Sequence, residues 1–85
     1  VHGGYLAALL DSTTGWAVHA HLPPGTAAPH LHLSVQYLRP AFAGQPLRCR
    51  GRCVKTGRRV FAAEAEITQG DRVVATATTT HLVAA

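Results

Sequence analysis

One segment near the start of the chain constrains the fold most, because Tyr5–Val18 is apolar almost all the way round a helix. Its length and its content of Ala and Leu favour a helix over a strand, and a helix with no broad polar face has to be buried. Pro23-Pro24-Gly25 prevents the helix from continuing beyond this point. We expect a short strand over His19–Leu22, just before the proline-rich turn.

The rest of the chain alternates between polar and apolar residues in runs separated by turn residues, which is the pattern of antiparallel strands and hairpins. An apolar helix followed by such a meander predicts an α+β fold, in which a curved antiparallel sheet wraps the helix. Tight turns are expected at Thr56-Gly57 and at Gln69-Gly70-Asp71. The expected strands are His30–Leu38, Leu47–Lys55, Arg59–Thr68 and Arg72–Val83.

Alternation within the first of these strands predicts which of its side chains share a face. The apolar face should carry Leu31, Leu33, Val35 and Tyr37. The opposite face should carry His30, His32, Ser34 and Gln36.

The length limits the chain to one small domain, residues 1–85, which buries only about 60% of its extended surface when alone. Cys49 and Cys53 would lie about 13 Å apart on a strand, beyond disulfide reach, which favours a reduced, cytoplasmic setting.

No apolar run approaches the roughly 20 residues of a membrane span, and no signal peptide opens the chain. Because the chain lacks Met and begins inside a motif, we expect its true N-terminus to lie upstream.

Asp11 is the one charged residue of the apolar helix, and no Lys or Arg lies within 27 residues of it. Burying an unpaired carboxylate costs several kcal/mol. Asp11 therefore either bonds locally to Ser12, Thr13 or Thr14, or lies on a narrow polar stripe. The alternative is a general base or nucleophile in a cleft of low dielectric, where desolvation raises the basicity of the carboxylate.

His2-Gly3-Gly4 would open the helix, where unsatisfied N–H groups and the positive end of the helix dipole suit a developing oxyanion. A plain glycine N-cap is the alternative. Asp11 follows His2 by nine residues, about 13 Å along a helix, so one chain cannot bring both to one carbonyl group. If they share a site, Gly3 comes from one subunit and Asp11 from an antiparallel partner in an isologous two-fold dimer.

These features and three further segments, in this order, resemble the hotdog-fold acyl-CoA thioesterases of the phenylacetic-acid-degradation (PaaI-like) type, within the 4-hydroxybenzoyl-CoA thioesterase superfamily. The resemblance covers nearly the whole chain. It depends on His2-Gly3-Gly4 with the acid nine residues later, and on the segment Leu10–Val18 that contains this acid. The three further segments are Val35–Pro40, Lys55–Val60 and Ala75–Thr80.

The resemblance implies hydrolysis of an acyl-CoA thioester at a homodimer interface, often within a tetramer of two dimers, with no metal or redox cofactor. By position, the Gly3 N–H is implied to bind the thioester oxygen, and His2 to shape the turn before it. Asp11 of the other subunit is implied to be the base or nucleophile. His30 stands where the family uses a Ser or Thr to orient water or the acid.

The positive charges concentrate in residues 48–59, which include six Lys or Arg residues and no Asp or Glu. Alternation puts Arg48, Arg50 and Arg52 on one face, and a solvated outer face explains them most simply. Nucleic-acid binding is the rival use of such a patch, but no aromatic side chains interleave to stack bases, so no nucleic-acid partner is expected. The resemblance instead implies contact with CoA phosphates, which Arg recognises well. The implied CoA-binding residues are Arg39, Lys55, Thr56, Gly57, Arg58, Arg59 and His81.

Two further groups of side chains have alternative explanations. Leu6, Leu10 and Trp16 are expected to line an acyl pocket of undetermined specificity, although a Trp on such a helix more often belongs to the core. His19-x-His21 and His30-x-His32 each place two imidazoles about 6.6 Å apart on a strand, as in metal sites. A metal needs three or four ligands, so surface or subunit-contact histidines are expected and no metal.

The sequence therefore predicts an acyl-CoA thioester hydrolase that acts through Asp11 and the Gly3 N–H. A hotdog dehydratase or hydratase is a rival, but those enzymes generally pair an Asp with a nearby His on a different motif. A non-catalytic module that binds acyl-CoA or nucleic acid is the rival from another class. Release of free CoA, lost on substitution of Asp11, would separate the enzyme from that module.

Overall fold

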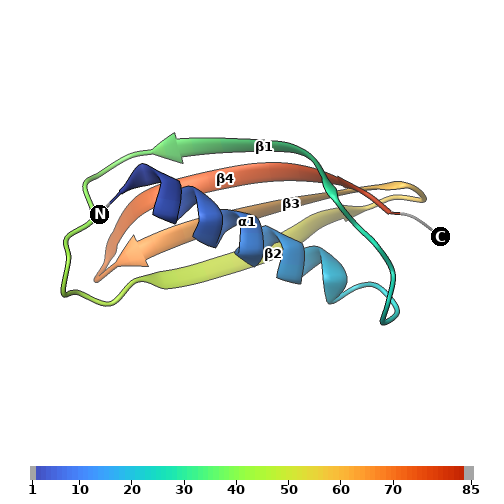
Figure 1. The fold of residues 1–85 in the computed structure, drawn as a ribbon, viewed down its shortest axis with the longest axis horizontal. Coiled ribbons are helices and arrows are strands. Elements are labelled where there is room, and N and C mark those ends of the chain that lie inside the picture. Colours follow the sequence, from blue (N-terminus) through green and yellow to red (C-terminus); the bar gives the residue numbers. More distant parts are fainter. Residues whose placement is uncertain (1, 84–85) are drawn as a thin grey trace.

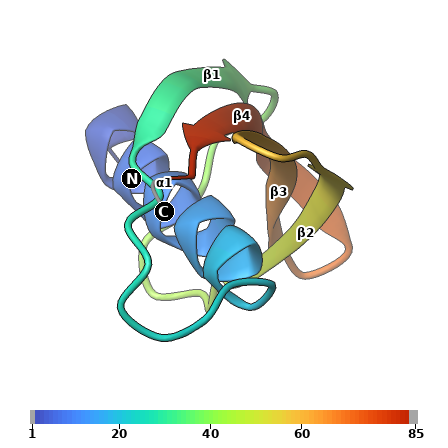
Figure 2. The same cartoon turned by 90° about the vertical axis from the view of Figure 1, so that its right-hand side faces the viewer.

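One helix lies across a four-stranded antiparallel sheet in the computed structural model, which describes residues 2–83 (Figure 1). The elements are α1 (Gly3–His19), β1 (His30–Tyr37), β2 (Arg48–Thr56), β3 (Val60–Gln69) and β4 (Arg72–Leu82). The strand order is β1-β4-β3-β2. Seen end-on, the sheet curls around one side of α1 (Figure 2). The predicted α+β architecture is confirmed.

Helix α1 begins at its N-cap, His2, whose backbone is extended and whose Nδ1 accepts a hydrogen bond from the Gly4 N–H at 2.9 Å. The residues after His19 form turns, with the His21 N–H bonded to the Val18 carbonyl at 3.0 Å. The expected strand over His19–Leu22 is therefore wrong. The local i to i+3 bonds that close the helix occupy backbone groups that a strand would need.

The core forms where a stripe of α1 packs on the inner face of the sheet. The buried residues of the helix recur at every fourth position, which places them along one side of it. They are Leu6, Leu10, Thr14 and Val18. The inner faces of β3 and β4 present small side chains, so the helix can approach closely. The buried ones are Ala63, Ala65, Ala75 and Ala77, joined by the larger Ile67 near the end of β3.

Strand β1 departs from the predicted alternation at its first residues. His30 pairs with His81 and His32 pairs with Thr80, so Leu31 is an extra residue in a β-bulge. The bulge turns His30 toward α1, where its ring contacts Thr14, and leaves Leu31 57% exposed. The predicted orientations of His30 and Leu31 are therefore wrong, because a bulge depends on the pairing with the neighbouring strand.

His81 on β4 is fully buried behind His30. Its Nδ1 lies 3.1 Å from the Ala28 carbonyl oxygen, which can only accept, so Nδ1 carries the hydrogen. Its Nε2 lies 2.9 Å from the Thr79 hydroxyl and accepts from it. Burial lowers the pKa of His81 below the ordinary value of 6.5, opposed by the hydrogen bond to Ala28. His81 is a neutral core residue with both ring nitrogens satisfied.

The contact between α1 and β2 predicts that Gly51→Ala destabilises the fold. A Cβ at Gly51 would lie 2.8 Å from the Thr13 carbonyl oxygen and from its Cγ2. We expect the free energy of unfolding in urea to fall by roughly 1–3 kcal/mol, the usual cost of overpacking. Arg50→Ala, at the neighbouring position on the outer face, should change it by no more than about 0.5 kcal/mol. Equal stabilities of the two variants would contradict this packing.

Burial of neutral His81 predicts that stability falls in mild acid. In the unfolded chain this imidazole takes up a proton below about pH 6.5, whereas the folded protein resists doing so. The free energy of unfolding should therefore decline as pH falls through 6.5 and level off below the depressed pKa. Urea titrations near pH 8 and near pH 5.5 measure the decline. His81→Gln should be less stable at the higher pH yet lose less on acidification; an unchanged decline would refute this assignment.

Candidate active site

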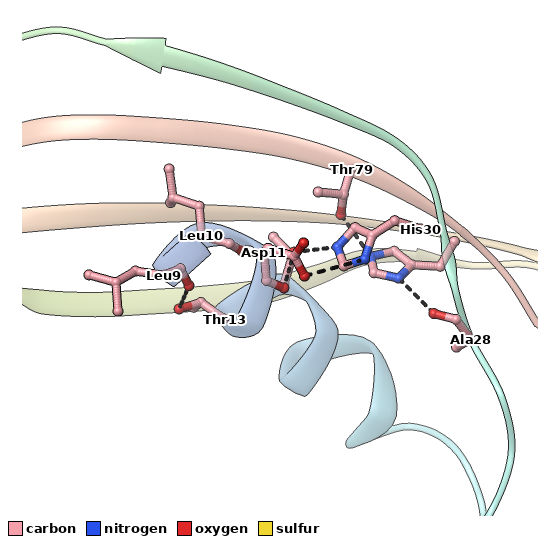
Figure 3. Close-up of polar contacts among 9 residues, drawn as sticks. Leu9, Leu10, Asp11, Thr13, Ala28, His30 and Thr79 are labelled. Carbon is pink, nitrogen blue, oxygen red and sulfur yellow. Dashed lines mark hydrogen bonds and ion pairs between the residues drawn. The ribbon is translucent and has the colours of Figure 1, made fainter. Parts of the chain in front are cut away.

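The conspicuous polar pair on the helix side of the sheet is Asp11 with His30. The His30 Nδ1 lies 3.7 Å from the Asp11 Oδ1, and the two side chains are 23% and 58% exposed, respectively. The His30 Nε2 lies 3.0 Å from the Thr14 hydroxyl, one turn further along α1. Figure 3 shows Asp11 projecting from the helix toward His30. The bulge in β1 and the helical spacing of Asp11 and Thr14 together create this contact.

Asp11 is not desolvated within a single chain, contrary to the expectation of a carboxylate buried in a cleft. Local hydrogen bonds do not explain the residue either. The Thr13 hydroxyl donates to the Leu9 carbonyl at 2.7 Å, and the Thr14 hydroxyl donates to backbone carbonyls rather than to the Asp11 carboxylate. The side chain instead lies on the open side of α1 with one face against an imidazole.

The start of α1 presents a free backbone donor. Gly4 donates to the His2 side chain, and the Tyr5 and Leu6 N–H groups bond to the His2 carbonyl at 3.1 and 3.3 Å. Among residues 2–83, no acceptor lies at the Gly3 N–H. The positive end of the helix dipole acts at the same place, so this N–H is suited to bind a negatively charged oxygen.

Tyr37 holds this donor in place, a role that the sequence analysis missed. Its hydroxyl donates to the Gly3 carbonyl oxygen at 2.9 Å, from the last residue of β1. Strand alternation had already put Tyr37 on the helix face, which was the available signal. A surface hollow beside this contact is lined by Gly3, Leu6, Tyr37, Leu38, Arg39, Pro40 and Ala41.

Gly3 and Asp11 do not meet within one chain. Both lie on one uninterrupted helix, so eight residues of helical rise separate them by roughly 12 Å. Strand β1 nevertheless touches both groups, since Tyr37 bonds to Gly3 at one end and His30 contacts Asp11 at the other.

The residues expected to bind CoA divide between two ends of the sheet. Arg39 lies by the Gly3 hollow and donates to the Val73 carbonyl at 2.9 Å. The β2–β3 hairpin lies at the opposite end, next to His30, because Thr56 pairs with Phe61, Phe61 with His81, and His81 with His30. This hairpin carries exposed Lys55, Thr56, Arg58 and Arg59 around Gly57, whose N–H bonds to the Val60 carbonyl at 3.1 Å.

Two of the expected contacts need correction, and so does the core alternative for Trp16. His81 cannot reach a nucleotide, because it is fully buried and both of its ring nitrogens are bonded within the chain. Leu10 is fully buried in the core and has no surface to offer an acyl chain. Trp16 is 80% exposed, so the core alternative for this residue is wrong; it borders a shallow hollow with Leu9 and Cys49.

Four of the remaining charged residues gather away from α1. Arg50 and Arg52 lie on the outer face of the sheet with Glu64 and Glu66, and Arg52 donates to the Glu64 carboxylate. In the part of the chain that the structure describes, no three His, Cys, Asp or Glu side chains gather as a metal site would require. Helix α1 is not long and apolar enough to cross a membrane.

Comparison with known proteins identifies a matching family and several similar solved structures. The thioesterase superfamily matches residues 1–76. A phenylacetic acid degradation-related protein from Ralstonia eutropha is 43% identical with a TM-score of 0.91, and the match covers 98% of this chain and 62% of that one. A variant of the phenylacetic acid degradation protein PaaI from Thermus thermophilus is 32% identical with a TM-score of 0.87, over 96% of this chain and 68% of that one.

A protein from Bacillus halodurans, solved with CoA, is 32% identical with a TM-score of 0.91, over 99% of this chain. The chain spans 59% of the length of that protein and 62% of the Ralstonia protein. No curated protein is significantly similar in sequence. On its motifs, its fold and these matches, the chain belongs to the thioesterase superfamily and has the hotdog fold of its PaaI-like members.

Proposed function

We propose that this protein hydrolyses an acyl-CoA thioester to the free acid and CoA in a site shared by two copies of the chain. Asp11 of one copy serves as the base or nucleophile, and the Gly3 N–H of the other binds the thioester oxygen. Membership of the thioesterase superfamily supports hydrolysis of a thioester, and the relative solved with CoA supports an acyl-CoA substrate.

The observation that carries the proposal is that β1 contacts both Asp11 and Gly3. Among residues 2–83, β1 borders the sheet on one side and pairs only with β4. If two copies pair antiparallel along this edge about a two-fold axis, the His30 end of one β1 lies beside the Tyr37 end of the other. Asp11, next to His30, then approaches the partner's Gly3, which is held by the partner's Tyr37.

The same two-fold pairing would bring the divided CoA-binding residues together. It places the hairpin of one copy, with Lys55, Arg58 and Arg59, at the end of the partner that carries Arg39. Guanidinium groups bind phosphates well, and this end also carries the Gly3 N–H. A CoA with its phosphates on the hairpin would therefore have its thioester directed toward the shared site.

Two groups suffice for the chemistry because the leaving group is a good one. A thiol with a pKa near 8.5 departs as thiolate with little help, so the protein has to activate a nucleophile and stabilise an oxyanion. A positioned base contributes roughly 10²- to 10⁴-fold to the rate, and one oxyanion donor contributes roughly 10²- to 10³-fold. We propose further that two such dimers pair as a tetramer. The proposal leaves the acyl group open, and a panel of aryl and aliphatic acyl-CoAs would identify the preferred substrate.

The proposal predicts that Asp11→Asn lowers kcat for acyl-CoA hydrolysis by roughly 10²- to 10⁴-fold, since the amide cannot accept a proton. A thiol reagent that detects free CoA measures the rate. Asp71→Asn is the matched control, because Asp71 lies exposed in the β3–β4 turn and should leave kcat unchanged. Near-normal turnover by Asp11→Asn would remove this residue from the mechanism. CoA binding without thiol release from any acyl-CoA would select a non-catalytic binding module.

A further inference from the structure

We propose that the outward side of α1 is the surface through which two of the proposed dimers pair, so that a second copy of the chain covers it. This inference rests on the dimer of the proposed function and names the face that its tetramer would use. Helical spacing places four exposed residues opposite the buried side of α1. They are Tyr5, Ala8, Ser12 and Trp16, and we refer to them as the outward stripe.

The outward stripe exposes two aromatic side chains and no charged group. Trp16 is 80% exposed and Tyr5 is 55% exposed. Helix α1 contains no Lys or Arg, and its one acid, Asp11, turns toward His30. A solvated helix normally carries charged residues on the side opposite its core. The apolar pattern that predicts burial all round α1 is therefore satisfied on one side only, where the sheet curls around the helix (Figure 2).

The lack of charge determines which kind of partner fits the outward stripe. The centres of specific interfaces are enriched in Trp and Tyr and depleted of charged residues. A nucleic acid would meet no cation here, and a helix that lies on a lipid surface carries Lys and Arg along its polar face, which α1 lacks. A second copy of the chain brings an equally uncharged stripe, so no like charges meet when two stripes pair.

The outward stripe has a projecting end and a hollow end, which makes it complementary to itself. Trp16 projects near the end of α1, and Tyr5 borders a surface hollow near its start. The apolar lining of that hollow also includes Leu9, Phe42 and Leu47. A two-fold axis through the middle of the stripe would place Trp16 of each copy over the hollow of the other. Ala8 and Ser12 lie at that axis, where their small side chains let the two helices approach closely.

The aromatic area of the outward stripe is sufficient for an interface between dimers. In the proposed dimer both α1 helices lie on the same side of the joined sheet, so both stripes face outward together. At about 150–250 Å² for each aromatic side chain, Tyr5 and Trp16 leave roughly 300 Å² exposed in each chain. Four chains would bury roughly 1,200 Å² through these two residues alone, which reaches the range of specific interfaces.

Trp16 is the only tryptophan of the chain, so its fluorescence reports directly on this surface. We expect the unsubstituted protein to sediment as a tetramer with Trp16 shielded from the quencher acrylamide. Tyr5→Glu places a carboxylate against the partner's Trp16, where no cation can pair with it. The dissociation constant between dimers should rise by roughly 100-fold or more, as it does when an interface hot spot is lost. The resulting dimers should keep the parent kcat and expose Trp16 to acrylamide.

Thr78→Lys is the matched control, because Thr78 lies exposed on the outer face of β4, within the other broad surface of the protein. This variant should leave both the tetramer and the quenching of Trp16 unchanged. Trp16→Lys is a second variant of the outward stripe and should also yield dimers. It decides the question by sedimentation if Tyr5→Glu fails to fold, as judged by circular dichroism.

The outcomes separate this inference from the proposed function. A tetramer that survives both stripe variants, or that dissociates only with Thr78→Lys, would overturn the outward stripe as the interface and leave the two-chain site intact. A parent protein that stays dimeric, or dimers in which Trp16 remains shielded, would overturn it as well. A protein that stays monomeric would overturn the shared site and this inference together. A tetramer joined through the stripe that releases no CoA from any acyl-CoA would overturn hydrolysis alone.

Discussion

The close packing of α1 on an alanine-lined sheet is the constraint on which the rest of this structure depends. Ala65, Ala75 and Ala77 leave space for Leu6 and Leu10 to reach the sheet, and Ala63 does the same for Val18. Gly51 lets β2 approach the Thr13 backbone. A helix held in this way stays continuous from Gly3 to His19. Its rise then fixes the free N–H of Gly3 and the carboxylate of Asp11 roughly 12 Å apart. No adjustment within one chain can join them.

In the proposed dimer, strand β1 explains how two copies would bring these groups together. It contacts the helix tip through Tyr37 and the helix middle through His30, so the two chemical groups are tied to opposite ends of one edge strand. The proposed two-fold axis at that edge would exchange the ends. The exposure of Asp11 in the single chain fits this account, since the partner would bring to Asp11 an apolar surface and an oxyanion donor that its own chain cannot place there.

Much of the fold could be predicted from the sequence because its elements follow strong local patterns. The apolar run over Tyr5–Val18 and the alternating strands identified the helix and the meander, and the glycine and proline positions marked the turns. The prediction failed where the outcome depends on a neighbouring element. The bulge at Leu31 is set by pairing with β4, and the turns over His19–Leu22 are set by bonds back to the last residues of α1.

The candidate site shows the same limit. His2, Gly3 and Asp11 could be selected from their spacing, but the apolar pattern of α1 did not indicate which side faces the sheet, so Leu10 and Trp16 were assigned to a pocket they do not share. His81 was assigned to the CoA-binding residues because the resemblance implies that the end of the last strand meets the nucleotide. Its burial follows from the polar partners that Ala28 and Thr79 provide, which are distant or inconspicuous in the sequence.

The most direct test of the shared site is activity in mixed oligomers of Asp11→Asn and Gly3→Pro. Proline is well tolerated at the first helical position, the extended backbone of His2 can precede it, and it removes the donor N–H. Gly3→Ala is the control, because it keeps the N–H and its Cβ would lie in ordinary contact, 3.4 Å from the Tyr37 ring. Random mixing by co-expression should restore roughly a quarter of the parent activity, since half of the dimers then contain one intact site. Activity no higher than that of the separate variants would contradict a site built from two chains.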